Sequence, residues 1–149
     1  MSNKLYTIGY GKFKPEQVKA LVEKSGAVLV DVRFSPRSRN PQWAKSNVEK
    51  LVGKGNYLHL NSLGNRNYKG DGPIEIVDIE RGTQAVATIL ETRSVILMCQ
   101  CWDLAHCHRL PASEFIAQKL GVELAHLSPA DLEAKEPAEP PAPLQPSLF

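Results

Sequence analysis

Short apolar runs alternate with amphipathic stretches along most of the chain, and this alternation constrains the fold more than any other feature. The apolar runs predict short strands at Leu5–Gly9, Val28–Val32, Tyr57–Leu60, Ser94–Met98 and Val122–Leu127. The amphipathic stretches between them predict helices at Pro15–Ser25, Ala44–Gly53, Val77–Glu91 and Leu110–Leu120. Repeated strand–helix units favour a mainly parallel sheet with helices on both faces. We therefore predict a single three-layer α/β domain with about five strands.

The composition changes after residue 127, where the strand–helix alternation ends. Six of the eleven prolines lie within residues 128–149, mixed with alanine and glutamate. A segment of this composition cannot bury enough apolar surface to offset its ordering entropy. We therefore predict an α/β domain over residues 1–127, followed by a flexible Pro-rich tail over residues 128–149.

Composition argues against several classes of protein. No stretch approaches the roughly 20 apolar residues that a membrane-spanning helix needs, and the N-terminus lacks the layout of a signal peptide. The three cysteines crowd into residues 99–107, which favours reduced thiols over a disulfide framework. We expect a cytoplasmic protein with no membrane partner and no cofactor. The body is basic and the tail acidic, which is compatible with a nucleic-acid or phosphate partner.

A ligand is expected at the carboxyl ends of the predicted strands. In open α/β sheets, ligands bind in the crevice outside these ends. Four loops leave the strands at this edge, and they span residues 9–13, 33–43, 61–73 and 99–109. We therefore look for site residues in these loops.

The loop from Cys99 to Arg109 carries the densest reactive chemistry, because it connects a buried strand to the start of a helix. A helix start attracts anions, and Arg109 adds a forked donor for phosphate or carboxylate. A thiol in the same field is a better nucleophile. The candidate catalytic residues are Cys107, His108 and Arg109.

Two other interpretations of this loop stay open. Its cysteines and histidine could ligate a metal, although their spacing departs from the paired C-x2-C pattern of zinc sites, so metal is the weaker alternative. The ligands would then be Cys99, Cys101, Cys107 and His108. The cysteines could instead be small hydrophobes at the end of a core strand.

A second candidate region begins at Asp31. A carboxylate inside an apolar strand needs a partner, so we expect Asp31 to support the structure by orienting an arginine. Trp43 either offers a face on which a base could stack or caps the core. The candidate phosphate- or ligand-binding residues are Tyr10, Arg33, Arg37, Arg39, Trp43 and Asn65.

These segments resemble a known family. TIGY near the start, VDVRFSPRSRNPQW, YLHLNSLGN and the closing MCQC…AHCHR are similar to the family catalogued as domain of unknown function 488, over nearly all of residues 4–127. The resemblance implies a compact α/β fold with a shared site and no assigned reaction. More distantly, the pattern is similar to rhodanese and cysteine-phosphatase domains, whose Cys-x5-Arg cradle is absent from this sequence.

The chain ends in Gln145-Pro146-Ser147-Leu148-Phe149. This pentapeptide resembles the motif by which bacterial replication and repair proteins bind the DNA sliding clamp. The resemblance implies that Leu148 and Phe149 are apolar anchors and that Gln145 forms a hydrogen bond at the rim of the clamp pocket. A flexible tail would present the motif while leaving the domain free to reach DNA.

Together these features predict a DNA-transaction protein, in repair or nucleotide processing, with a Cys/His/Arg anion-binding site and a tail that binds the sliding clamp. An enzyme acting on nucleic acid or a nucleotide is the favoured version, with no reaction assigned. The alternatives are a non-catalytic nucleic-acid-binding adaptor and a small-molecule enzyme that uses cysteine chemistry.

Overall fold

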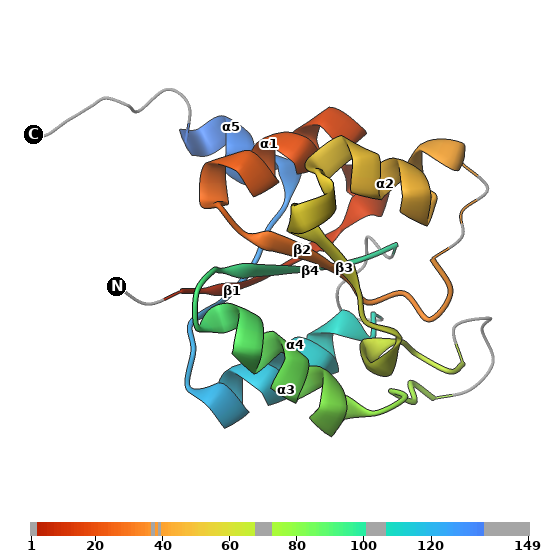
Figure 1. Ribbon diagram of the computed structural model, residues 1–149, viewed down its shortest axis with the longest axis vertical. Helices are drawn as coiled ribbons and strands as arrows, with labels where there is room; N and C mark the ends of the chain where they lie inside the picture. The colour runs from red at the N-terminus through yellow and green to blue at the C-terminus, as the bar shows by residue number, and fades with distance from the viewer. Residues whose placement is uncertain (1–2, 37, 39, 68–72, 101–106, 136–149) are drawn as a thin grey trace, which may run out of the picture.

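The computed structural model describes residues 3–36, 38, 40–67, 73–100 and 107–135 (Figure 1). Its centre is a five-stranded sheet in the order β3-β2-β4-β1-β5, and all neighbouring strands run parallel. The strands are β1 (Leu5–Gly9), β2 (Val28–Asp31), β3 (Tyr57–His59), β4 (Val95–Cys99) and β5 (Leu124–His126). The predicted α/β fold with a parallel sheet is confirmed.

Helices cover both faces of the sheet (Figure 1). The helices on one face are α1 (Pro15–Ser25), α2 (Lys45–Val52) and α5 (Pro129–Lys135), and those on the other are α3 (Ile79–Leu90) and α4 (Arg109–Leu120). Short 3-10 helices lie in the connections, at η1 (Tyr10–Lys12), η2 (Pro41–Trp43), η3 (Lys54–Asn56) and η4 (Asn61–Leu63). None of the helices in the described part of the chain has the length and apolar character that crossing a bilayer requires.

Helix α1 illustrates how local sequence sets the ends of an element. Pro15 occupies the first turn, where its missing N–H costs no hydrogen bond. Gly26 follows the last residue with a φ of 68°, a left-handed conformation that glycine adopts without strain. Between these ends, Val18 and Val22 are buried against the sheet. These signals are local, which is why the predicted bounds of α1 agree with the structure.

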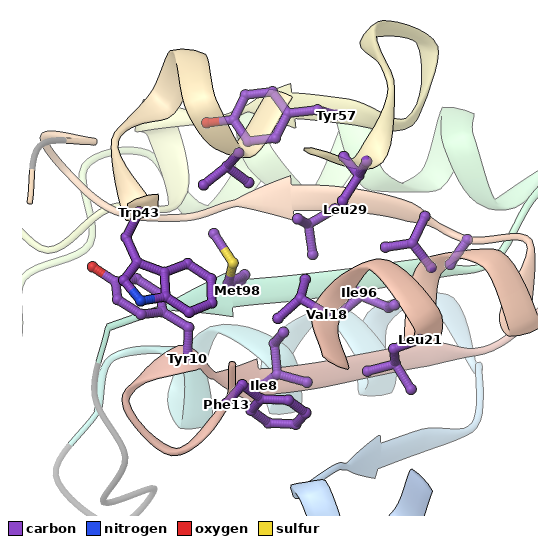
Figure 2. Close-up of a cluster of buried hydrophobic side chains, with 14 of the residues drawn as sticks. Ile8, Tyr10, Phe13, Val18, Leu21, Leu29, Trp43, Tyr57, Ile96 and Met98 are labelled. Carbon is purple, nitrogen blue, oxygen red and sulfur yellow. The ribbon is translucent and has the colours of Figure 1, made fainter. Parts of the chain in front are cut away.

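The sheet separates two apolar cores. Successive side chains of a strand point to opposite faces, so Ile96 and Met98 of β4 join one core while Leu97 and Cys99 join the other. Figure 2 shows the first core, which lies under α1 and α2. All five residues of β4 are buried, as expected for a central strand.

The segment after β5 differs from the prediction. The flexible tail was expected to begin at residue 128, but residues 129–135 form α5, and Leu132 packs into the core under α1. The backbone N–H of Ser128 donates to the Asp131 carboxylate at 2.7 Å, which caps the helix start. The proline-rich composition obscured this capping pattern, so the folded body extends at least through α5.

A close backbone approach at Gly64 gives the first prediction. A Cβ atom added there would lie 2.6 Å from Cα and 2.8 Å from the backbone nitrogen of Phe34, so the loops that follow β2 and β3 would have to separate. We expect Gly64→Ala to lower the free energy of unfolding by about 1–3 kcal/mol, as overpacking does.

Gly55 is the matched control for this prediction. Nothing lies within 4 Å of a Cβ added at Gly55, so we expect Gly55→Ala to change stability by no more than about 1 kcal/mol. Urea denaturation of both variants beside the parent chain measures the difference. Equal midpoints for the two variants would show that the loops have room for a side chain at Gly64.

Candidate anion-binding site

The carboxyl ends of β1, β4 and β5 lie side by side at one edge of the sheet. Gly9 of β1 is in register with Cys99 of β4, and Thr7 of β1 is in register with His126 of β5. The chain leaves β1 toward α1 on one face and leaves β4 toward α4 on the other (Figure 1). Adjacent strands whose connections diverge in this way form the usual ligand crevice of an open α/β sheet.

Arg109 begins α4 at this edge and is almost completely buried. Its side chain is 4% exposed, and its Nη1 donates to Oγ1 of Thr7 at 3.1 Å. Its Nε has no hydrogen-bond partner in the described part of the chain. Among the described residues, no carboxylate forms an ion pair with it. Arg109 is therefore a buried cation with unused donor capacity.

The electrostatics of Arg109 reflect this burial. Loss of solvent lowers the pKa of the guanidinium, and negative charge on Cys99 partly opposes that effect. An arginine nevertheless stays charged at neutral pH. Because an unpaired buried charge is costly, an anion bound beside Arg109 would relieve a cost that the folded chain already carries.

Arg109 is one of the residues that line a pocket of about 180 Å³. The pocket is lined by Gly9, Lys12, Phe13, Arg109, His126, Leu127, Ser128 and Pro129. The lining residues in the described structure include basic side chains and no acidic one. The pocket therefore has the charge and the donors that suit an oxyanion.

His126 extends the hydrogen bonding of Arg109. Its Nδ1 lies 2.6 Å from Oγ1 of Thr7, the same oxygen that accepts from Arg109. Burial lowers the pKa of the imidazole, and the nearby Arg109 charge lowers it further, while Glu114 opposes both. The ring is consequently neutral at neutral pH, and the Thr7 hydroxyl can donate its proton to Nδ1.

A second polar centre lies under α2, at the ends of β2 and β3. The Arg33 guanidinium donates to both oxygens of the Asp31 carboxylate, with Nε at 2.8 Å from Oδ1. Tyr57 donates to Oδ2 of Asp31 at 2.6 Å. Asp31 is fully buried and Arg33 is 6% exposed, so this is a desolvated network rather than a surface ion pair.

The Asp31 carboxylate shifts the pKa values of the two side chains that donate to it. Burial alone would lower the pKa of Arg33, but hydrogen bonding and charge attraction from Asp31 outweigh it and the pKa lies above its usual value. Burial raises the pKa of Tyr57, and the Asp31 charge raises it further. Both side chains therefore stay protonated and donate to Asp31.

The remaining donors of Arg33 are also used within the chain. Nη1 donates to the Trp43 carbonyl at 2.8 Å and to Oη of Tyr10 at 3.2 Å. The Tyr10 and Trp43 rings stack with centroids 4.3 Å apart and an interplanar angle of 20° (Figure 2). Both rings are buried, so Trp43 presents its face to Tyr10 rather than to a ligand. Arg33 serves the fold through these contacts.

The cysteine–histidine segment lies between the two polar centres. Sγ of Cys99 and Sγ of Cys107 lie 2.7 Å apart, and both side chains are buried. Cys107 is disulfide-bonded to a residue other than Cys99, so the expectation of reduced thiols throughout is wrong for Cys107. His108 is 8% exposed, and its Nε2 lies 2.8 Å from the Val32 carbonyl. In this state the Cys107 sulfur is not a nucleophilic thiolate.

The structure thus divides the candidate residues of the sequence into groups. Cys107, His108 and Arg109 lie together at the start of α4, whereas Tyr10, Asp31, Arg33 and Trp43 form the separate network. Asn65 holds its own loop, because its Oδ1 accepts from the backbone N–H groups of Asn67 and Glu75. The candidates outside the described residues are Arg37, Arg39, Cys101, Gln145, Leu148 and Phe149.

Three residues of the pocket region were missed by sequence reasoning: Thr7, Lys12 and His126. A signal existed for Thr7, which is a polar residue inside an apolar strand and is completely buried. His126 lies on the edge strand β5. Its link to Arg109 depends on a strand pairing that no local pattern encodes.

Comparisons with known proteins support the family over part of the chain. Residues 14–72 match the family described as "Domain of unknown function DUF488", a segment that contains Asp31 and Arg33 but not Cys107, His108 or Arg109. No curated protein matches the sequence. The chain is similar to a de novo designed protein with a P-loop NTPase fold, solved by NMR, at 16% identity and a TM-score of 0.46, covering 93% of this chain and 76% of that one.

Proposed function

We propose that this protein binds an oxyanion of the phosphate class in the pocket beside Arg109. The observation that carries the proposal is the buried Arg109 guanidinium, whose Nε has no hydrogen-bond partner among the residues that the structure describes. Buried guanidinium groups are almost always paired, so an unpaired one beside a basic pocket favours an anionic ligand. Lys12 and His126 line the same pocket and supply further positive charge or donors.

A phosphate group suits these donors better than a single carboxylate does. Its oxygens can accept from several directions at once, and a guanidinium presents its N–H groups in a fork that matches two of them. Nucleotides and nucleic acids carry such groups, and we therefore keep them as the proposed partners. The proposal concerns binding. It assigns no reaction, and catalysis by Cys107 and His108 stays a prediction from sequence.

Titration of the full-length, 15N-labelled chain with inorganic phosphate and with pyrophosphate tests the proposal. We expect saturable shifts in the amide signals of Gly9 and Lys12 and in the Nε–H signal of Arg109. Sodium chloride at matched ionic strength is the control for screening. Shifts that do not saturate, or that chloride reproduces, would remove the proposed site.

The tail gives a second proposal, which rests on sequence alone. The pentapeptide from Gln145 to Phe149 resembles a sliding-clamp motif, and an apolar pair such as Leu148 and Phe149 at the end of a polar tail suits a partner pocket. Clamp binding would bring an anion-binding domain to DNA, which agrees with a role in repair or nucleotide processing.

Fluorescence polarisation of the labelled full chain with a bacterial clamp tests the tail. We expect binding that is lost when Leu148 and Phe149 are both replaced by alanine, because the apolar anchors supply most of the affinity. Lack of binding at high micromolar clamp, while a known motif peptide binds alongside, would end this proposal without affecting the phosphate pocket.

A further inference from the structure

Two sulfur atoms and one imidazole converge in the core beside the end of β4. The ligand atoms of Cys99, Cys107 and His108 all lie within 4.8 Å of one another, and all three residues are buried. They come from two segments, since Cys99 ends β4 and the other two lead into α4. The parallel strands and the helix start therefore hold these groups together without a local sequence motif.

The hydrogen bond of His108 determines which ring nitrogen is available. The Val32 carbonyl can only accept, so Nε2 of His108 must carry the proton that bridges the 2.8 Å between them. In the neutral ring, Nδ1 then keeps its lone pair. A histidine whose second nitrogen donates to a backbone carbonyl is the usual arrangement of a metal ligand.

We infer that Cys99, Cys107 and His108 form a buried binding site for a zinc ion, which the chain holds when Cys107 is reduced. Thiolate sulfur and neutral imidazole nitrogen are the preferred donors of zinc. The spacing departs from C-x2-C, so metal binding is the weaker alternative from the sequence alone. The three-dimensional clustering supplies the support that the spacing lacked.

The site needs a small adjustment to accept the ion. Zn–S and Zn–N bonds of about 2.3 and 2.0 Å put tetrahedral ligand atoms about 3.3–3.8 Å apart. The ligand atoms of the three residues now lie within 4.8 Å of one another, which is close to this range. The two sulfur atoms are now 2.7 Å apart and would separate by about 1 Å when the ion binds. A side-chain rotation is sufficient for a change of this size.

The Cys107 sulfur atom can form a disulfide bond or bind the zinc ion, but it cannot do both at once. A phosphine reductant transfers two electrons to the disulfide and takes up oxygen from water, which leaves Cys107 and its former disulfide partner as thiols and gives a phosphine oxide. Cys99 and Cys107 then lose their protons to solvent as the metal binds. Oxidation of the thiols by a diazene reagent reverses the step, reduces the reagent to the hydrazine and releases the ion.

Cobalt substitution of the full chain tests this inference. We expect the phosphine-reduced chain to bind one Co²⁺ with thiolate-to-cobalt charge-transfer bands and strong tetrahedral d–d bands, and Zn²⁺ to displace it. Cys99→Ser and His108→Gln should each weaken binding on the order of 100-fold. The diazene-oxidised chain should show neither band system.

His59→Gln is the matched control, because Nε2 of His59 also lies 2.8 Å from a backbone carbonyl, that of Arg33, but lies outside the cluster. We expect His59→Gln to keep the parent affinity. Absence of thiolate bands in the reduced parent chain would overturn the inference, even if a ligand variant failed to fold. Unchanged affinity after oxidation, or in the folded Cys99→Ser and His108→Gln variants, would also overturn it. The phosphate titration is carried out on the metal-free chain. The phosphate-binding proposal and the zinc-site inference can therefore fail independently of each other.

Discussion

We expect the Arg109→Met variant to be more stable than the parent chain and to bind phosphate more weakly. Methionine fills a similar buried volume without a charge, and Arg109 has no carboxylate partner among the described residues to be left unpaired. Replacing buried charges by apolar side chains of similar volume is neutral or stabilising by about 1–4 kcal/mol. A lost charge-assisted hydrogen bond to phosphate lowers affinity about 10- to 100-fold.

Thermal unfolding without ligand and the phosphate titration measure the two effects on the same samples. The combination matters, because a destabilising variant that also loses binding would show only that the pocket had collapsed. If Arg109→Met is less stable than the parent and still binds phosphate, Arg109 is a structural residue and the anion site lies elsewhere.

Arg93 provides the matched control for Arg109. Its guanidinium donates to the carbonyls of Gly26 and Ala27 at 2.9 and 3.0 Å and to the Asn56 side chain at 2.7 Å, so its donors are used within the chain. We expect Arg93→Met to lower stability, because three hydrogen bonds from a charged donor are lost. Its phosphate affinity should equal that of the parent.

The second large effect is expected at Asp31. Replacing Asp31 with asparagine removes the negative charge that compensates Arg33, which is 6% exposed, and removes an acceptor of Tyr57. Breaking a buried ion pair from one side costs about 3–5 kcal/mol. Urea denaturation of Asp31→Asn should therefore show a large fall in the free energy of unfolding.

A double-mutant cycle separates the charge from the packing. Adding Arg33→Met to Asp31→Asn removes the uncompensated cation, and we expect part of the stability to return. Tyr57→Phe alone should cost only about 1 kcal/mol, because the Asp31–Arg33 pair stays intact. If Asp31→Asn were nearly neutral, Arg33 would have an alternative partner, and its predicted role as a phosphate ligand would regain support.

Arg33 and Arg109 show which features of the site could be predicted from the sequence. Arg33 and Arg109 both followed apolar strands in sequence, and both were assigned to a ligand. The structure separates them, since Arg33 has a carboxylate two residues away and Arg109 has none among the described residues. The need of Asp31 for a partner could be predicted from the neighbouring residues in the sequence. The lack of a carboxylate partner at Arg109 among the described residues could not be predicted in this way.

The fold itself was largely predictable, because its signals are short-range. The strand bounds agree within a few residues, and those of β1 and α1 agree at both ends. The short 3-10 helices were missed, as was α5, whose start depends on the cap between Ser128 and Asp131. Composition averaged over the tail concealed that single contact.

The sequence by itself determined the strand–helix alternation, the parallel sheet and the edge at which a site should lie, because hydrophobic periodicity and end signals act over a few neighbouring residues. Only the tertiary structure decided which polar groups meet at that edge. Arg109 reaches Thr7 across 102 positions, and His108 reaches the Val32 carbonyl across 76. Burial and hydrogen-bond partners arise from such distant contacts, so the unpaired guanidinium and the cluster of sulfur and imidazole become visible only in the folded chain.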